Sequence, residues 1–241
     1  MESESDKELN KIIRENPDVT KIWFERKDIK TLPKEIGQLK RLEELSFDSC
    51  KLSSLPKEIG DLSNLKKLRI LSNDLEELPD TIGNLTNLQY LTLNGNRIRF
   101  LPAEIGRLFN LRELRLQGNE LAELPKEIGN LRNLRYLAVK NNKLKTLPRE
   151  LGYLSPHKLL ISGNPLPYAY SVSFGLCTVE ELLKHLRDGT TPPSKPDNSI
   201  TCPSCAGTGV EAWDDGRKGK CYRCEGTGVS YPDFGLDAEY E

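Results

Sequence analysis

The stretch PAEIGRLFNLRELRLQGNELAEL, from Pro102 to Leu124, contains the pattern from which most of the chain is built. The dipeptide Leu-Pro recurs with a step of 23 residues, at Leu32, Leu55, Leu78, Leu101, Leu124 and Leu147. A glycine five residues after each of these leucines keeps the step, and so do the asparagines at positions 73, 96, 119 and 142. A fixed period of about 20–50 residues is the signature of a repeat architecture, so the chain is predicted to form a solenoid.

Within this unit, LRELRL (residues 111–116) has apolar residues at alternate positions near its end, as a short strand with one buried face does. The proline and glycine that follow break the strand and turn the chain. Stacked units then place their strands side by side in a parallel sheet, because no single unit can bury its apolar face alone. We expect Leu111, Leu114, Leu116 and Leu121 to be buried against their counterparts in neighbouring units.

The period and the residue pattern resemble the 23-residue leucine-rich repeats of intracellular proteins, of the Ras-suppressor-like and bacterial types, which have the consensus LxxLxLxxNxLxxLPxxIGxL. The resemblance implies an α/β fold: a right-handed solenoid, or horseshoe, of about seven short parallel strands, with an asparagine ladder running from coil to coil. Cys50 replaces the asparagine in an early unit and Lys27 stands there in the first. The last such residue is Asn164, one position early, which predicts the loss of one residue around Ser155 to His157.

Helices are predicted to cover both ends of the solenoid. Ser5 to Glu8 has capping-box spacing, with apolar residues at helical spacing after it, and Thr178 to Glu181 repeats that arrangement before a second apolar stripe. The Pro- and Ser-rich stretch that follows reads as a linker. The predicted organisation is a capping helix (1–18), a solenoid with a C-terminal capping helix (19–189), a linker (190–200), a cysteine-rich module (201–230) and an acidic tail (231–241).

If the leucines point inward, the residues between them form the concave surface of the sheet. Three columns of side chains are expected there: Lys21, Glu44, Lys67, Tyr90, Glu113, Tyr136, Lys158; Trp23, Ser46, Arg69, Thr92, Arg115, Ala138, Leu160; and Glu25, Asp48, Leu71, Asn94, Gln117, Lys140, Ser162. Their chemistry changes from acidic in the early strands to basic and aromatic in the later ones. Because Tyr and Arg often dominate interface energy, the expected partner-binding residues are Trp23, Arg69, Tyr90, Arg115, Tyr136 and Lys140. The alternative is a solvated face with no partner.

Four cysteines near the C-terminus have the spacing C-x2-C-x15-C-x2-C. This spacing predicts one structural Zn²⁺ held by four thiolates, from Cys202, Cys205, Cys221 and Cys224. The alternative is a redox-active CxxC pair. The segments CPSCAGTG and CYRCEGTG also resemble the CxxCxGxG motif of DnaJ-type cochaperones, a zinc-finger-like, metal-binding motif. Since neither His157 nor His185 is followed by Pro-Asp, stimulation of an ATPase is not implied. Cys50 and Cys177 are predicted to be small buried hydrophobes.

Charge and patterning restrict the partners. The chain has 35 basic and 36 acidic residues, and from Thr201 onward only four basic residues stand against eight acidic ones, so nucleic acid is not expected as a ligand. The N-terminal MESESDKELNKIIREN lacks the apolar core of a secretory signal, and no window approaches a membrane span. A cytoplasmic protein that does not bind membranes is expected.

No sequence motif of a known catalytic type is present: the chain has no GxSxG, GxxxxGK[ST] or HExxH and only two histidines. The chain is therefore not expected to be an enzyme. The predicted function is a protein-interaction adaptor or scaffold that binds a protein or peptide on the concave face, with a second contact through the zinc module. The alternative is a chaperone-like or thiol-redox accessory protein that uses the CxxC module.

Overall fold

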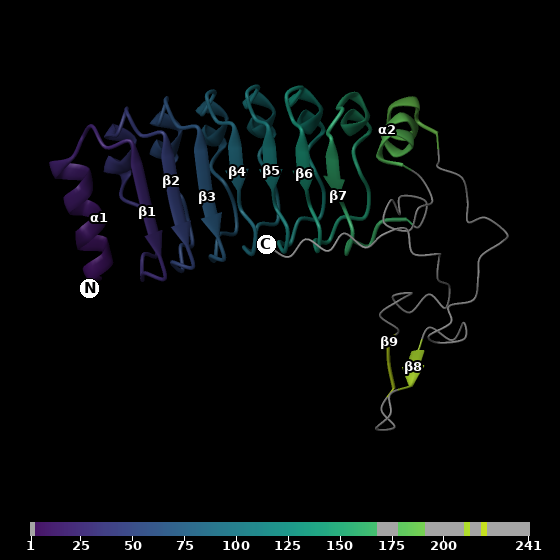
Figure 1. Ribbon diagram of the computed structural model, residues 1–241, viewed down its shortest axis with the longest axis horizontal. Coiled ribbons are helices and arrows are strands. Elements are labelled where there is room, and N and C mark those ends of the chain that lie inside the picture. The colour runs from purple at the N-terminus through teal and green to yellow at the C-terminus, as the bar shows by residue number, and fades with distance from the viewer. Residues whose placement is uncertain (1–2, 168–177, 191–209, 213–217, 221–241) are drawn as a thin grey trace.

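The computed structural model describes residues 3–167, 178–190, 210–212 and 218–220, with only the backbone of the last two ranges. Seven strands form one parallel sheet in chain order, as the repeat period predicts (Figure 1). Their bounds are β1 Lys21–Glu25, β2 Glu44–Asp48, β3 Lys67–Leu71, β4 Tyr90–Thr92, β5 Glu113–Arg115, β6 Tyr136–Ala138 and β7 Lys158–Leu160. Each strand pairs with the next repeat's strand, so the fold is a solenoid of stacked coils.

Six 3₁₀ helices lie on the other side of the coils. They are η1 Lys34–Gln38, η2 Lys57–Asp61, η3 Asp80–Asn84, η4 Ala103–Arg107, η5 Lys126–Asn130 and η6 Arg149–Tyr153. The proline of each Leu-Pro pair is the N-cap of one of these helices, where its fixed φ is already suitable and its missing N–H is not needed. The sequence predicted that proline and glycine turn the chain there, but it did not predict helices.

The glycine of each repeat allows the 3₁₀ helices to stack closely. A Cβ added at Gly37 would lie 2.7 Å from the carbonyl oxygen of Glu58 in the next repeat, and one at Gly106 would lie 2.6 Å from that of Glu127. Backbone atoms cannot move aside as a flexible side chain can, so any larger residue would push the coils apart. The 23-residue spacing of glycine is therefore a packing requirement.

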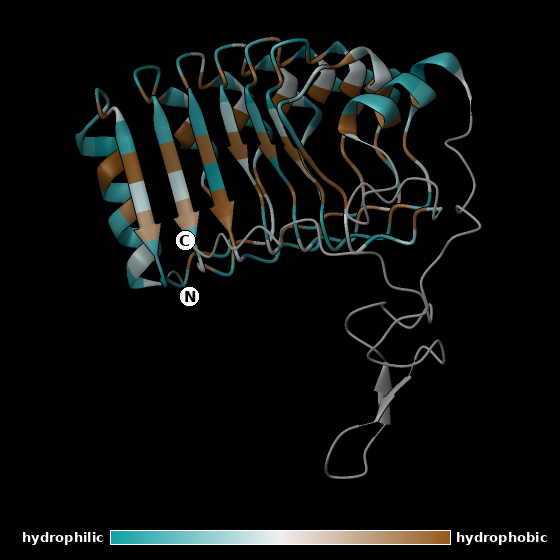
Figure 2. Ribbon diagram, turned by 45° about the vertical axis from the view of Figure 1, so that its right-hand side comes forward, coloured by the Kyte–Doolittle hydropathy of each residue, from teal (hydrophilic) through white to brown (hydrophobic). Residues whose placement is uncertain are grey.

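The space between the sheet and the 3₁₀ helices is filled by the repeating leucines and isoleucines. Leu111, Leu114, Leu116 and Leu121 are all fully buried, which confirms the predicted core. Hydrophilic and hydrophobic bands alternate along the strands in Figure 2, because successive side chains point to opposite faces of the sheet.

The asparagine ladder is present. Asn73, Asn96, Asn119 and Asn142 are buried, and each side chain bonds backbone groups of its own coil and of the preceding one. Asn164 continues the ladder, and β6 pairs Tyr136 with Lys158, a step of 22 rather than 23, which confirms the loss of one residue. Cys50 takes the same buried place with its Sγ against the carbonyl oxygens of Phe24 and Asp48, and burial raises the pKa of its thiol.

A second asparagine column, which the sequence reasoning missed, runs along the turns that lead into the strands. Asn64, Asn87, Asn110 and Asn133 each donate from Nδ2 to a backbone carbonyl of the preceding coil, at 2.7–2.8 Å. These side chains are exposed, so water competes for the bond. The signal was nonetheless visible as a further Asn repeating every 23 residues.

Helix α1 (Glu4–Glu15) lies beside the first coil and buries Leu9 and Ile13 in the common core. Its capping box is formed by Ser3 and Asp6 rather than by Ser5 and Glu8, so the predicted helix start was wrong by two residues. Ser3 is fixed at this position because its hydroxyl also donates to the carbonyl oxygen of Asp28, at 2.7 Å.

Helix α2 (Val179–Asp188) lies at the other end of the array (Figure 1). Thr178 and Glu181 form its capping box, and Gly189 ends it in a left-handed conformation. A Cβ on Gly152 of η6 would lie 2.5 Å from the carbonyl oxygen of Leu183. Helix α2 therefore occupies the place that the next 3₁₀ helix would take.

Two further strands, β8 (Val210–Ala212) and β9 (Lys218–Lys220), pair antiparallel with Val210 opposite Lys220. The four predicted zinc ligands and Cys177 lie outside the described residues, as do most of the predicted linker and the whole acidic tail. Among the helices that the structure describes, none has the length and apolar character of a membrane span.

Candidate functional site: the exposed sheet face

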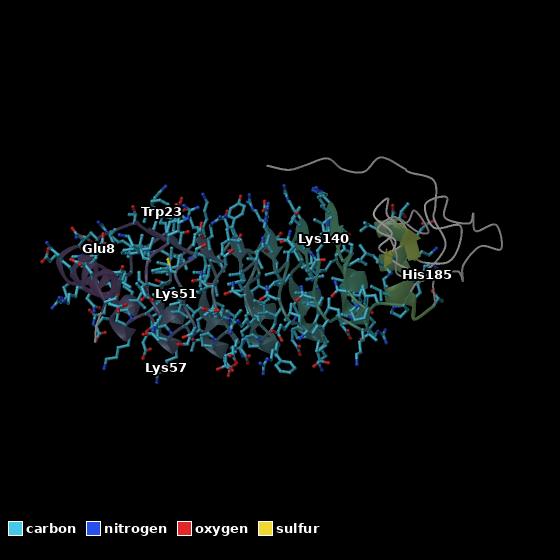
Figure 3. All side chains as sticks on the ribbon, turned by 90° about the horizontal axis from the view of Figure 1, so that it is seen from below. Glu8, Trp23, Lys51, Lys57, Lys140 and His185 are labelled. Atoms are coloured by element: carbon cyan, nitrogen blue, oxygen red, sulfur yellow. The ribbon has the colours of Figure 1, made fainter. Side chains whose placement is uncertain are left out.

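Parallel pairing lines up side chains of successive repeats on the sheet face opposite the 3₁₀ helices, which we call the exposed sheet face. The strand register places Lys21, Glu44, Lys67, Tyr90, Glu113, Tyr136 and Lys158 in one column. It places Trp23, Ser46, Arg69, Thr92, Arg115, Ala138 and Leu160 in the next. Trp23 and Lys140 project from the same side of the array, and Lys57 of η2 projects from the other (Figure 3). The predicted alignment of the strand columns is confirmed.

The predicted change from acidic to basic side chains suggested an acidic zone on the early strands. The acidic side chains there are instead paired with basic neighbours. Asp48 is held by Arg69, whose Nε lies 2.8 Å and 3.0 Å from its two carboxylate oxygens. Glu44 lies between two lysines, 3.1 Å from Lys21 Nζ and 3.3 Å from Lys67 Nζ. Charges one repeat apart are thus neutralised by their neighbours in the same or the adjacent column.

Glu44 shows the electrostatic effect of this arrangement. The hydrogen bond from Lys21 lowers the pKa of its carboxyl group, partial burial opposes this, and Lys67 lowers the pKa further. The carboxylate therefore stays ionised at neutral pH. Arg69, predicted to be available to a partner, already has its Nε donor directed at Asp48.

The later strands are arranged differently, since Arg115 is held between an acid and an aromatic ring. Its Nε and Nη2 donate to Oε2 of Glu113 at 3.1 Å and 2.9 Å, while its guanidinium carbon lies 4.6 Å from the ring centroid of Tyr136. The Nζ of Lys158 lies 5.9 Å from that same centroid. Two cations on one ring make Tyr136 the centre of this half of the face.

Trp23 is the most exposed of the large apolar side chains that the structure describes, at 64%. It lies at the rim of an open depression of about 350 Å³ between α1 and β1. The charged lining residues include Glu8 and Lys27, whose carboxylate and ammonium groups are 3.6 Å apart. An aromatic side chain beside a partly charged hollow suits the anchoring of a peptide side chain.

Not every column residue is accessible. Ala138, which the sequence placed on the surface, is fully buried. Tyr90, Arg115, Tyr136 and Lys140 are half-buried, and Arg69 is exposed. The structure brings Arg115 and Tyr136 into contact but leaves Trp23 at the far end of the sheet.

Sequence reasoning missed Glu113, Asp48 and Lys158 as residues that set the geometry of the face. Each lies one column or one repeat away from a predicted residue and fixes or contacts its side chain. The signal was visible for two of them, as opposite charges at i and i+21 for Asp48 and Arg69 and at i and i+2 for Glu113 and Arg115.

Comparison with known proteins agrees with this geometry. Residues 22–100 match the model of a leucine-rich repeat region, and residues 110–131 match that of a leucine-rich repeat. The matched residues are therefore leucine-rich repeats, and the parallel sheet that they build is that of a leucine-rich repeat solenoid. No significant match was found among curated proteins.

Two solved structures are similar in fold and sequence. The Leptospira interrogans leucine-rich repeat protein LIC12759 is 45% identical with a TM-score of 0.55, and the match covers 58% of this chain and 36% of that one. The crystal structure of PEPR1–AtPEP1 is 28% identical with a TM-score of 0.54, over 60% of this chain and 21% of that one. The matched part thus spans about a third and a fifth of those proteins.

Proposed function

We propose that the protein is a non-catalytic, cytoplasmic interaction adaptor that binds a protein or peptide on the exposed sheet face. The observation that carries this proposal is the arrangement of Arg115 and Lys158 around the ring of Tyr136. Side chains held in place before binding lose little conformational entropy when a partner arrives. The crystal structure of PEPR1–AtPEP1, which is similar in fold, supports a binding role for a fold of this kind.

The chemistry of the face indicates the kind of partner. Its later half, from Glu113 to Lys158, carries Arg115, Lys140 and Lys158 but only one acid, Glu113, which is already paired with Arg115. A segment with one or two carboxylates beside an apolar side chain would meet cations at its charged groups and Tyr136 at its apolar one. Trp23 and the hollow beside it supply a second anchor at the early end.

The proposal includes a second contact, through a module of residues 201–230 organised by one structural zinc ion. Four thiolates at this spacing suit a closed tetrahedral site. The β8–β9 pairing supports this contact. Both strands lie between the two cysteine pairs in the sequence, and Cys221 directly follows Lys220, the last residue of β9. Bound zinc would supply folding energy rather than chemistry.

The test begins with affinity capture from native cytosol, using the whole chain and a truncation ending near Gly189. The captured partner is then titrated against a variant with Arg69, Tyr90, Arg115 and Tyr136 all changed to Ala. Each true hot spot should cost about 2 kcal/mol of binding free energy. The matched control changes Lys34, Lys57, Lys126 and Arg149, which are exposed on the 3₁₀ helices, to Ala. Equal affinity of the two variants would show that the partner binds elsewhere.

A further inference from the structure

A second surface, separate from the exposed sheet face, lies along the turns that lead from the 3₁₀ helices into β5 and β6. These turns read RLFNLR (residues 107–112) and NLRNLR (residues 130–135). They contain four arginines and no acidic residue. We call this surface the arginine edge and define it by Arg107, Phe109, Arg112, Arg132 and Arg135, all of which are exposed.

The arginines are stacked by the repeat geometry. The backbone N–H of Arg135 donates to the carbonyl oxygen of Arg112 at 2.8 Å, which puts the two residues one coil apart. Asn133 Nδ2 donates to the carbonyl oxygen of Phe109 at 2.7 Å and so joins the neighbouring positions of the same coils. Like charges in adjacent coils repel one another, so nothing in the packing of the fold favours this arrangement.

None of the four arginines forms an ion pair with any residue in the described part of the chain. The corresponding turns of the early repeats differ. There Lys66 pairs with Glu43 at 2.9 Å, and Lys40 Nζ donates to the carbonyl oxygen of Asp61 at 2.9 Å. The early turns thus contain an acid that pairs with one of their cations, whereas the turns of the arginine edge contain no acid.

The edge also has an apolar contact point. Phe109 is 57% exposed, and it lines an open depression of about 380 Å³ together with Asn130, Arg132 and Asn133. An exposed ring, two amides and a guanidinium around one hollow suit an acidic ligand that carries an aromatic or other apolar side chain.

We propose that the arginine edge is the docking surface for residues 231–241 of this same chain. That segment, YPDFGLDAEYE, has four carboxylate side chains and three aromatic rings and no basic residue. Its charge and its aromatic content complement those of the edge. This inference does not depend on the partner proposed for the exposed sheet face.

The chain can reach the edge. In Figure 1 the strands begin along the upper edge of the array, and α2 lies at the right-hand end of that edge. Helix α2 packs on η6, and the arginine edge begins one coil further along, at a spacing of about 5 Å per strand. Residues 191–200 alone can span about 33 Å when extended.

The experiment uses the full chain with a benzophenone photo-crosslinker in place of Phe234. Mass spectrometry should place the crosslinks in residues 107–135. Changing Arg112, Arg132 and Arg135 to Glu should reduce their yield at least tenfold. Changing Asp237, Glu239 and Glu241 to Lys in the same chain should restore it. The matched control changes Lys30, Lys34 and Lys57 to Glu, which reverses the same charge elsewhere and should leave the yield unchanged.

Two further measurements keep the test decisive. Crosslinking a 1:1 mixture of isotopically labelled and unlabelled chains should give crosslinks within one chain only. Asn and Gln in place of the segment's acids leave the solenoid untouched and should lower the yield as the arginine changes do. Crosslinks to the exposed sheet face, crosslinks between chains, or a yield insensitive to the arginine changes would overturn the proposal. Tight binding of a single-stranded oligonucleotide to the arginine edge, with no crosslinks there, would overturn it as well.

Discussion

The side-chain Oδ1 of Asn119 accepts a hydrogen bond from the backbone N–H of Ile98 at 3.0 Å, although the two residues are 21 positions apart. The Nδ2 of Asn119 donates to the carbonyl oxygens of Leu93 and Leu116 at 2.9 Å and 3.0 Å. One side chain thus satisfies three buried backbone groups in two coils. Together with the pairing of the parallel strands, such bonds fix the register of the coils.

Replacing Asn119 with Ala should therefore destabilise the array strongly. The buried N–H of Ile98 would lose its partner, and an unsatisfied buried group costs about 1–3 kcal/mol before relaxation or water entry. The carbonyl oxygens of Leu93 and Leu116 would each lose one bond and keep a second one, from Asn96 and Asn142. The control is Asn110→Ala in the same repeat, which removes one exposed hydrogen bond to Thr86 and should cost less than about 1 kcal/mol. Urea unfolding followed by circular dichroism measures both. Similar midpoints for the two variants would contradict the role assigned to the buried ladder.

The facing of the strands gives a second prediction. Leu114 is fully buried, so Leu114→Asp would put an unpaired charge into the continuous core and should abolish cooperative melting. Thr92 lies on the exposed sheet face between Arg69 and Arg115 in its column, so Thr92→Asp should leave the melting temperature nearly unchanged. Calorimetry of the two variants decides the point, and comparable losses of stability in both would show that the facing is wrong.

The lysines beside Glu44 give a third prediction, read by NMR titration of its carboxyl group. Lys21→Ala should raise the pKa of Glu44 toward the ordinary value, because the bond from Lys21 is the main cause of its lowering. Lys67→Ala should raise it by less. A larger effect of Lys67→Ala than of Lys21→Ala would show that Lys67, rather than Lys21, is the main cause of the lowered pKa.

The sign of the linked stability change follows from the lowered pKa. A carboxyl group with a lower pKa in the folded state contributes stability above its unfolded pKa and loses it as the pH falls through the folded value. Glu44→Gln should therefore flatten the acid limb of the stability profile. Since water screens this exposed cluster, the change should stay below about 1 kcal/mol.

The fourth prediction concerns metal content. Protein purified under reducing conditions should contain about one zinc per chain by elemental analysis, and the double variant Cys205→Ser with Cys224→Ser should contain none. Chelation should unfold the module of residues 201–230 and leave the melting of the solenoid unchanged, because the solenoid has a core of its own. A metal-free, folded module with a reversible disulfide between Cys202 and Cys205 would instead favour the thiol-redox accessory role.

The sequence predicted the solenoid and the facing of its leucines because a strict 23-residue period leaves one register for every strand. Side chains such as Leu114 could be assigned from alternation alone, since a shift of one residue would expose the whole apolar set. The start of α1 could not be assigned in that way. Ser3 and Ser5 each have an acid three residues later, and the choice rests on the bond from Ser3 to Asp28, a residue in another coil.

The candidate site was predicted only as a set of positions. The columns follow from the period, but the state of each side chain depends on its neighbour one coil away. Arg69 and Arg115 look alike in the sequence, yet one faces a carboxylate alone and the other is shared between a carboxylate and a ring. The arginine edge was missed because it lies in the turns before the strands, where side chains do not alternate between faces.

The position of α2 against Gly152 has a consequence for how the protein's length can vary. Helix α2 contacts the last coil where another coil would otherwise stack. The surface on which α2 packs is therefore the same whatever the number of coils before it. Deleting one complete 23-residue unit, such as residues 80–102, would keep every type of interface and shorten the sheet by one strand spacing, about 4.8 Å. The distance between two binding residues on the sheet can thus be changed in steps of one strand spacing, by adding or removing whole coils between them.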